Sequence, residues 1–316
     1  MASTAGKLRE LLTGPGMLTA PFVYDALQAK IAEDAGFDAV YMTGFGTAAA
    51  GTRLNLKEAV RLYEEALNLG VTYFDTAPEF AGYGRAQEQL GYLLRERRKE
   101  VFLVTKCWEP KGEDALKLLQ QNLRKLQTDY ADLVFVHSVG ADKMDPKIVF
   151  SRRGCYAALM KTKANGLTKY VGFSGHNRQG RFVDALKNFK VDVLLNAVNF
   201  VDHYTYNFEQ EVWPLANKKQ VGLIAMKVFG GENKKERSGL SHSMMPRQFH
   251  DMAFRYALSQ PGIASAAIGM AKRAELHQNI KRAKNFKAIT SREAAKLREI
   301  GKQFAKNWGP HFGPVV

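Results

Sequence analysis

Cysteine is scarce in this 316-residue sequence, which contains only Cys107 and Cys155. Two cysteines cannot build a disulfide framework, and these two do not have the Cys-x-x-Cys spacing of a metal site. Apolar runs of about 18 residues are absent as well, which argues against a membrane-spanning helix. The N-terminal stretch has no apolar segment of the kind found in secretory signals. We therefore expect a soluble, cytoplasmic protein with no metal centre.

Acidic residues are also few, because 31 Asp and Glu stand against 46 Lys and Arg, giving a formal net charge of +15. Such an excess can indicate affinity for a polyanion or for phosphate-bearing ligands. The basic residues are spread along many segments, as on an ordinary solvated surface. We therefore expect neither a nucleic-acid nor a membrane partner. Strongly salt-dependent binding without cofactor affinity would favour the polyanion alternative.

Short apolar runs recur along the chain with helical stretches between them, an alternation typical of parallel strands in an α/β fold. Right-handed crossovers close such a chain into a (β/α) TIM barrel. Helical spacing is clear in residues 58–70, 113–126 and 249–260, and Thr290 with Glu293 forms a capping box that opens a last helix. The apolar runs are residues 17–23, 38–44, 71–77, 101–107, 131–138, 170–176, 191–198, 221–229 and 263–270.

These nine runs exceed the eight strands of the usual closed barrel by one. No linker rich in Pro, Gly or Ser divides the chain, so we predict a single barrel domain over residues 1–316. Within it, residues 291–316 form a C-terminal helix and tail.

Three strand ends carry polar residues that apolar packing would not select. Asp75, Lys106 and His137 end three successive runs, and the C-terminal ends of barrel strands meet on one face. Reduction of a carbonyl needs a proton donor and a positive field near the oxygen. A Tyr whose pKa is lowered by a Lys would serve as the acid, an Asp would keep that Lys charged, and a His would hydrogen-bond the carbonyl.

The residues around these strand ends resemble the aldo-keto reductase family, with its tetrad of Asp, Tyr, Lys and His. The resemblance runs from about residue 57 to residue 290 and rests on GVTYFDTAPEFAGYGRAQEQLG, VFLVTK and ADLVFVH. It implies Asp75, Tyr83, Lys106 and His137 as the catalytic residues. Phe80 stands where the family has its tetrad Tyr. Either the local chain therefore places Tyr83 in the position of the proton donor, or the protein has little turnover.

The same resemblance implies a nicotinamide cofactor at the barrel mouth. Ser174 and Asn196 would hold its carboxamide, and residues 226–231 would lie along the pyrophosphate, with glycines allowing close approach. Lys272 and Arg273 would pair with a 2′-phosphate, which favours NADPH over NADH. The implied contacts are Ser174, Asn196, Met226, Lys227, Phe229, Gly230, Gly231, Lys272, Arg273, Gln278 and Asn279.

The first fifty residues resemble a different family. Residues 8–50 are similar to the start of the isocitrate lyase and phosphoenolpyruvate mutase superfamily, in which Tyr41 to Gly46 would cradle a carboxylate. The metal-binding acids and catalytic loop of those enzymes have no counterpart here, so we expect no such activity. We interpret the chain as a chimera of two barrels joined between about Gly44 and Lys57, engineered, or alternatively fused naturally at a shared Gly-Phe-Gly strand end.

Two barrel geometries follow from this interpretation. Residues 38–44 can serve as the first reductase strand, which leaves residues 17–23 as an extra βα unit. That unit is either a ninth strand in the barrel or displaced outside it. An added strand would widen the barrel and spread the tetrad.

Two functions follow in turn. The first is NADPH-dependent reduction of a small aldehyde or ketone, and the alternative is a non-catalytic recombined barrel that binds cofactor without turnover. The substrate and the oligomeric state are not predicted. Trp308, His311 and Phe312 in the C-terminal tail either line a pocket or cap the barrel.

Overall fold

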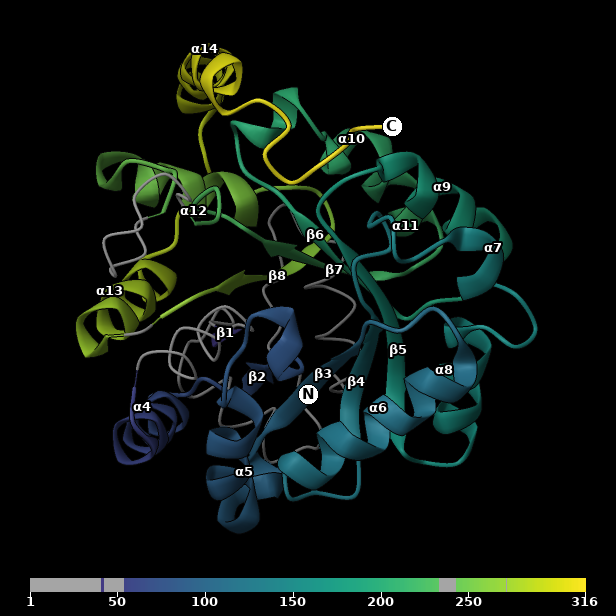
Figure 1. The fold of residues 1–316 in the computed structure, drawn as a ribbon. Helices are drawn as coiled ribbons and strands as arrows, with labels where there is room; N and C mark the ends of the chain where they lie inside the picture. The colour runs from purple at the N-terminus through teal and green to yellow at the C-terminus, as the bar shows by residue number, and fades with distance from the viewer. Residues whose placement is uncertain (1–40, 43–53, 233–242, 271) are drawn as a thin grey trace, which may run out of the picture.

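The computed structural model describes residues 41–42, 54–232, 243–270 and 272–316, and its strands form a closed parallel barrel with helices around it (Figure 1). Seven strands of three to eight residues are joined by a short first strand. The strands are β1 (Tyr41–Met42), β2 (Tyr73–Asp75), β3 (Phe102–Cys107), β4 (Ala131–Val136), β5 (Thr168–Gly175), β6 (Val193–Ala197), β7 (Gly222–Met226) and β8 (Ile263–Ile268).

The barrel closes through β1. Met42 is paired with Phe74 of β2 and with Ile268 of β8, so no further strand lies between these neighbours. The predicted α/β barrel with eight strands is therefore confirmed, and residues 38–44 contribute its first strand. The prediction of a ninth strand within the barrel is wrong, because β1 pairs directly with both β2 and β8. Residues 17–23 and the proposed junction up to residue 53 lie outside the described residues.

The connections between strands are helical. The α-helices are α4 (Leu56–Asn68), α5 (Ala86–Arg97), α6 (Gly112–Lys125), α7 (Pro146–Val149), α8 (Cys155–Ala164), α9 (Gln179–Asn188), α10 (Phe208–Glu211), α11 (Trp213–Lys218), α12 (His250–Leu258), α13 (Arg273–Lys284) and α14 (Ser291–Trp308). Single turns of 3₁₀ helix are η1 (Glu79–Ala81), η2 (Arg98–Glu100), η3 (Asp202–Tyr204) and η4 (Arg247–Phe249).

Local sequence explains the ends and faces of these helices. In α4, residues at helical spacing from Ala59 to Leu67 are buried against the barrel. Asn55 caps the helix, since its side-chain oxygen accepts the Glu58 N–H at 3.0 Å. The predicted capping box at α14 is confirmed, because the Glu293 N–H donates to Thr290 Oγ1 at 3.3 Å and the Thr290 N–H donates to the Glu293 carboxylate at 2.8 Å.

Strand alternation separates two apolar layers. One set of side chains fills the interior of the barrel, and the residues between them pack against the helices. We call the end where the strands begin the base and the end where they finish the mouth. The interior set is Tyr73, Phe102, Val104, Leu133, Phe135, Leu195, Ile224, Met226 and Ala267.

The described residues contain neither a membrane-spanning helix nor a cluster of metal-ligating side chains. No helix in this part of the chain is both long and apolar enough to cross a membrane. Within the same residues, no group of three or more His, Cys, Asp or Glu is arranged to hold a metal ion.

Candidate active site

A buried ion pair lies at the barrel mouth. Asp75 ends β2 and Lys106 lies near the end of β3, both on the inner face, and their exposed fractions are 2% and 1%. Lys106 Nζ donates to Asp75 Oδ1 and also to the Thr76 carbonyl oxygen at 3.0 Å. A buried ammonium needs such partners to remain charged. The fold thus brings these two predicted residues into contact.

Tyr83 reaches the same ammonium group. Its hydroxyl oxygen accepts a hydrogen bond from Lys106 Nζ at 3.4 Å. The loop between η1 and α5 turns sharply enough to bring the tyrosine to the lysine, because a glycine with positive φ lies on each side of Tyr83. The φ angles are 84° for Gly82 and 51° for Gly84. L-residues with side chains rarely adopt such angles. Of the two alternatives from the sequence, the structure therefore has Tyr83 beside the lysine.

Phe80 lies away from this contact. It is 54% exposed, and its ring stacks on Trp108 with a centroid distance of 6.3 Å. Lys143 Nζ lies 5.8 Å from the Phe80 ring centroid and 5.6 Å from that of Trp108. Phe80 is thus part of an aromatic rim, three residues before the tyrosine that contacts the buried lysine.

Burial and charge compete in setting the pKa values of this group. Burial would lower the pKa of Lys106, but Asp75 and Tyr83 outweigh it, so the pKa of the amine is raised and it stays protonated. Burial raises the pKa of Tyr83, and Lys106 offsets only part of that rise. Lys106 thus lowers the pKa of Tyr83 as expected, but desolvation of the phenol is the larger effect, so the net shift is upward.

His137 faces Ser174 across the mouth. His137 Nδ1 and Ser174 Oγ are 2.8 Å apart, and Ser174 is fully buried at the end of β5. Burial, with Lys106 and Lys227 nearby, holds the pKa of His137 well below its usual value, so the ring is neutral. When the Ser174 hydroxyl donates to Nδ1, the ring proton is on Nε2, where it can donate to a carbonyl oxygen.

Asn196 does not lie where the resemblance implied. Its side-chain oxygen accepts the Trp213 Nε1–H at 3.2 Å, and its amide nitrogen donates to the Gly175 carbonyl oxygen at 3.4 Å. The preceding residue, Leu195, belongs to the barrel interior, so Asn196 faces the surrounding helices. Its amide is occupied in holding α11 to β6.

The loop after β7 packs against the C-terminal tail. Gly230 and Gly231 have positive φ angles of 78° and 77°. A Cβ on Gly230 would come within 2.4 Å of the Trp308 ring, and one on Gly231 within 3.2 Å of Phe312. The groups that lie close to these glycines are therefore side chains of the C-terminal tail. Trp308 and Phe312 cap the mouth beside this loop.

Met226, which ends β7, and the residues that follow it have different surroundings. Met226 is buried in the barrel interior, and Lys227 has a φ of 57° with its Nζ 5.9 Å from the Phe312 ring centroid. Phe229 stacks on His250 with centroids 4.1 Å apart.

The predicted adenine end lies at the start of α13. Lys272 is exposed at the N-cap, while Arg273 forms two hydrogen bonds with the Glu65 carboxylate of α4, at 2.5 and 2.7 Å. Gln278 is exposed, and Asn279 is buried with its side-chain oxygen bonded to Arg282 at 2.9 Å. The structure brings Lys272 and Arg273 together at the surface and turns Asn279 inward.

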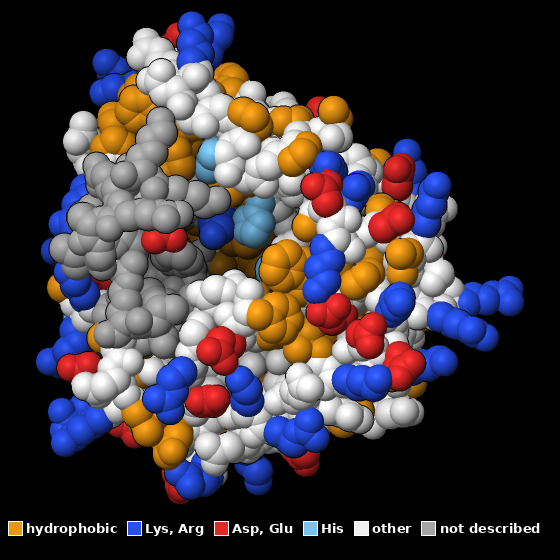
Figure 2. Space-filling model, in the orientation of Figure 1, with side chains coloured by type: hydrophobic (Ala, Val, Ile, Leu, Met, Phe, Trp, Pro, Cys, Tyr) orange, Lys and Arg blue, Asp and Glu red, His pale blue; other side chains and the backbone are white. Residues whose placement is uncertain are grey.

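Several mouth residues were missed by sequence reasoning. Trp108 lies between Phe80 and His137, and its Nε1–H is buried without a hydrogen-bond partner. His176 packs on Phe312 of the tail, with ring centroids 5.2 Å apart. Trp108 directly follows β3, a position that could have indicated it. On the face shown in Figure 2, His side chains lie with apolar ones in a central hollow.

The sequence profile of the Aldo/keto reductase family matches residues 43–251, more than half of the chain. The chain belongs to this family. An uncharacterized oxidoreductase of Bacillus subtilis is 25% identical over 300 residues, which covers 82% of this chain and 92% of that protein. L-galactose dehydrogenase of Arabidopsis thaliana is 25% identical over 275 residues, covering 76% and 83%.

Solved reductase structures share the barrel. A putative aldo-keto reductase from Pseudomonas aeruginosa is 27% identical with a TM-score of 0.60, over 79% of this chain and 92% of that one. The aldo-keto reductase from Klebsiella pneumoniae in complex with NADPH has a TM-score of 0.65 at 19% identity, over 84% and 91%, and shows the fold alone. None of these relatives is a lyase or mutase, so the chimera hypothesis gains no support from them.

Proposed function

We propose that this aldo/keto reductase reduces small aldehydes or ketones with NADPH and that Tyr83 donates the proton. The observation that carries the proposal is the contact of 3.4 Å between the Tyr83 hydroxyl oxygen and Lys106 Nζ, which is itself paired with Asp75. A phenol beside a buried, charged amine is a proton donor whose negative form is stabilised as it develops.

Each residue of the cluster has a distinct task in this reaction. A nicotinamide cofactor, when bound, supplies the hydride to the carbonyl carbon. The Tyr83 hydroxyl transfers its proton to the carbonyl oxygen, so that the product is an alcohol. Lys106 stabilises the resulting phenolate, and Asp75 keeps Lys106 charged and fixed in place. Neutral His137 donates a hydrogen bond to the carbonyl oxygen and orients it.

Ser174, Lys227 and Lys272 are the predicted positions that support a nicotinamide dinucleotide at the mouth. The Ser174 hydroxyl lies on the inner face beside His137, and Lys227 brings positive charge to the same end. Lys272 offers an exposed cation to a 2′-phosphate, which supports NADPH, whereas Arg273 would have to leave Glu65 to join it. Asn196 is left out of the proposed contacts because Trp213 and Gly175 occupy its amide.

The test is a titration with NADPH and with NADH, followed by tryptophan fluorescence, together with an assay of NADPH oxidation by a reactive aldehyde. Trp108 and Trp308 lie at the mouth and should report binding. We expect tighter binding of NADPH than of NADH, and turnover. Tyr83→Phe should lower kcat by about a thousandfold with little change in NADPH affinity.

The matched control is Phe80→Tyr, which places a phenol at the exposed rim. It should leave kcat of the parent protein unchanged and should not restore activity to the Tyr83→Phe variant. Restoration would assign the acid to position 80 and overturn the role of Tyr83. Binding without any turnover in the parent protein would favour the non-catalytic alternative instead.

A further inference from the structure

The C-terminal tail, residues 308–316, crosses the mouth of the barrel. In Figure 1 it runs in yellow from the end of α14 toward α9, where the Arg178 side chain donates to the Val316 carbonyl oxygen at 3.3 Å. Beyond Trp308 it contains no helix or strand. Side-chain contacts and individual hydrogen bonds therefore hold it in place, and segments held in this way open locally at less cost than the core of a fold.

The tail bridges the ends of two strands that lead to proposed cofactor contacts. Its Phe312 ring packs on His176, just after β5, with centroids 5.2 Å apart. Trp308 and Phe312 also lie against Gly230 and Gly231 of the loop after β7, so closely that an added Cβ would come within 2.4 and 3.2 Å of their rings. The loop therefore has no room to move toward the tail while the tail is docked.

Tyr206 anchors the tail to the barrel. It follows β6, which lies between β5 and β7, and its side chain is buried. Its hydroxyl oxygen accepts the Phe312 N–H at 2.8 Å, and the hydroxyl group donates to the Gly313 carbonyl oxygen at 3.0 Å. One hydroxyl thus makes two hydrogen bonds to the backbone of the tail, and neither bond involves a proposed cofactor contact.

We propose that the C-terminal tail is a strap that must detach for NADPH to enter or leave the mouth, and that the Tyr206 hydroxyl holds this strap closed. The inference rests on the proposed function, which draws cofactor contacts from Ser174 of β5 and from residues 226–231 after β7. The Tyr206 bonds join parts of the protein to each other, so they stabilise the closed strap equally with and without NADPH. Weakening them changes how often the strap opens and leaves the affinity for the cofactor unchanged.

The test compares the parent protein with Tyr206→Phe, which removes the hydroxyl and keeps the ring. In native-state hydrogen exchange, the Phe312 amide should exchange about tenfold faster in the variant, because two hydrogen bonds no longer oppose detachment. In stopped-flow measurements of tryptophan fluorescence, the rates of NADPH association and dissociation should both rise about tenfold. The Kd for NADPH should change by less than about twofold, since both rates rise together.

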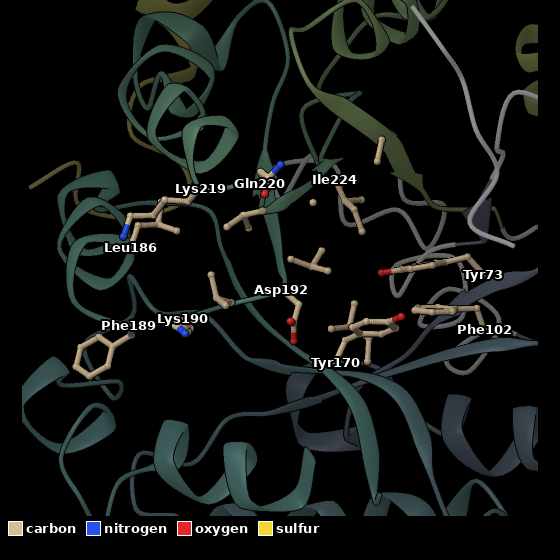
Figure 3. A pocket seen from close by; sticks show the side chains of 16 residues that line it. Tyr73, Phe102, Tyr170, Leu186, Phe189, Lys190, Asp192, Lys219, Gln220 and Ile224 are labelled. Carbon is tan, nitrogen blue, oxygen red and sulfur yellow. The ribbon is translucent and has the colours of Figure 1, made fainter. Parts of the chain in front are cut away.

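The matched control is Tyr156→Phe. The Tyr156 hydroxyl also donates to a backbone carbonyl oxygen, that of Lys190, at 2.7 Å. Lys190 lies at the base of the barrel, where it lines a pocket (Figure 3), so this hydrogen bond is at the opposite end from the tail. The control variant should leave the exchange of the Phe312 amide and both NADPH rates unchanged.

Three results would overturn the strap and leave the proposed reductase activity untouched. They are unchanged exchange of the Phe312 amide in Tyr206→Phe, faster exchange with unchanged NADPH rates, and weaker NADPH binding with an unchanged association rate. The last result would make the hydroxyl part of the cofactor site. Absence of NADPH binding to the parent protein and to both variants is a different outcome, because it would overturn the proposed function and the strap together.

Discussion

Two buried carboxylates lie at opposite ends of the barrel, and they are held in different ways. Asp75 at the mouth is paired with Lys106, whose side chain is only 2% exposed, and the pair touches a tyrosine hydroxyl. Asp132 near the base is paired with Arg98 and Lys169, whose side chains are 13% and 36% exposed. Asp132 also accepts the Leu103 N–H at 2.8 Å.

The difference separates a group of the proposed active site from a structural one. At the base, the cations reach solvent, and Arg98 also donates to the carbonyl oxygens of Val101 and Tyr130, so the network joins η2 to β3 and β4. At the mouth, the charge is sealed from water and has a proton donor within reach. Electrostatic forces are stronger in such a site because little water screens them.

The largest effects on turnover and on the free energy of unfolding should come from replacing the cationic partner of each carboxylate. Lys106→Met should abolish measurable turnover and lower the free energy of unfolding by about 3–5 kcal/mol, because Asp75 is left buried without its partner. Arg98→Met should lower the free energy of unfolding by about 1–2 kcal/mol and leave kcat unchanged, since Lys169 and the Leu103 N–H still compensate the charge of Asp132. Urea unfolding and steady-state kinetics measure both quantities.

A double variant sharpens this contrast. Asp75→Leu added to Lys106→Met removes both charges and should recover much of the lost stability without any activity. Equal loss of kcat in the Lys106 and Arg98 variants would contradict the distinction between the two ends.

A third buried carboxylate extends the comparison to pH. Asp202 accepts a hydrogen bond from the Asn199 amide, and its other carboxylate oxygen lies 3.7 Å from His311 Nδ1. Burial raises the pKa of Asp202 to about 7. Between pH 4 and 7 the folded protein therefore keeps a proton that the unfolded chain has lost, and this group makes stability fall as pH rises, by at most about 1.4 kcal/mol per unit.

The measurement is urea unfolding across this pH range for the parent and for Asp202→Asn, which mimics the protonated acid. The free energy of unfolding of the parent minus that of the variant should decrease as pH rises and should level off above pH 7. A difference that does not vary with pH would mean that Asp202 is ionised throughout.

The smallest effect should come from the loop that presents Tyr83. Gly82→Ala should cost about 1 kcal/mol of stability, because φ is 84° and nothing lies within 4 Å of the added carbon, so backbone strain is the only penalty. It should also lower kcat about tenfold by shifting Tyr83. Gly166→Ala is the control, with a φ of 77° and equal space in a loop remote from the mouth.

Gly166→Ala should cost similar stability and leave kcat unchanged. If both variants kept full activity, the position of Tyr83 would not depend on the Gly82 turn.

The barrel and the place of three site residues could be predicted from local sequence, whereas the catalytic roles of those residues stay predictions. The barrel follows from alternating strands and helices, and Asp75, Lys106 and His137 follow from strand ends that meet at one face. Tyr83 stayed one of two alternatives because its position depends on positive φ angles at two glycines and on Phe80 packing against Trp108, which lies 28 residues further along the chain.

Other site features depend on contacts that no local pattern reveals. Arg273 is bound by Glu65, 208 positions away in the sequence. Asn196 was misassigned although strand alternation could have indicated its face, since the neighbouring Leu195 points into the barrel. The order of elements can be predicted from periodicity, whereas the partners of individual side chains require the closed barrel.

The brevity of β1 also bears on how the barrel opens. Among the described residues, Met42 is paired with β2, and Tyr41 and Met42 are paired with β8, whereas β4 and β5 are in register from Ala131 to Val136. Cooperative opening begins where few backbone hydrogen bonds must break. In native-state hydrogen exchange, the amides of Tyr41 and Met42 should therefore exchange before those between β4 and β5, which would report the stability of the whole barrel.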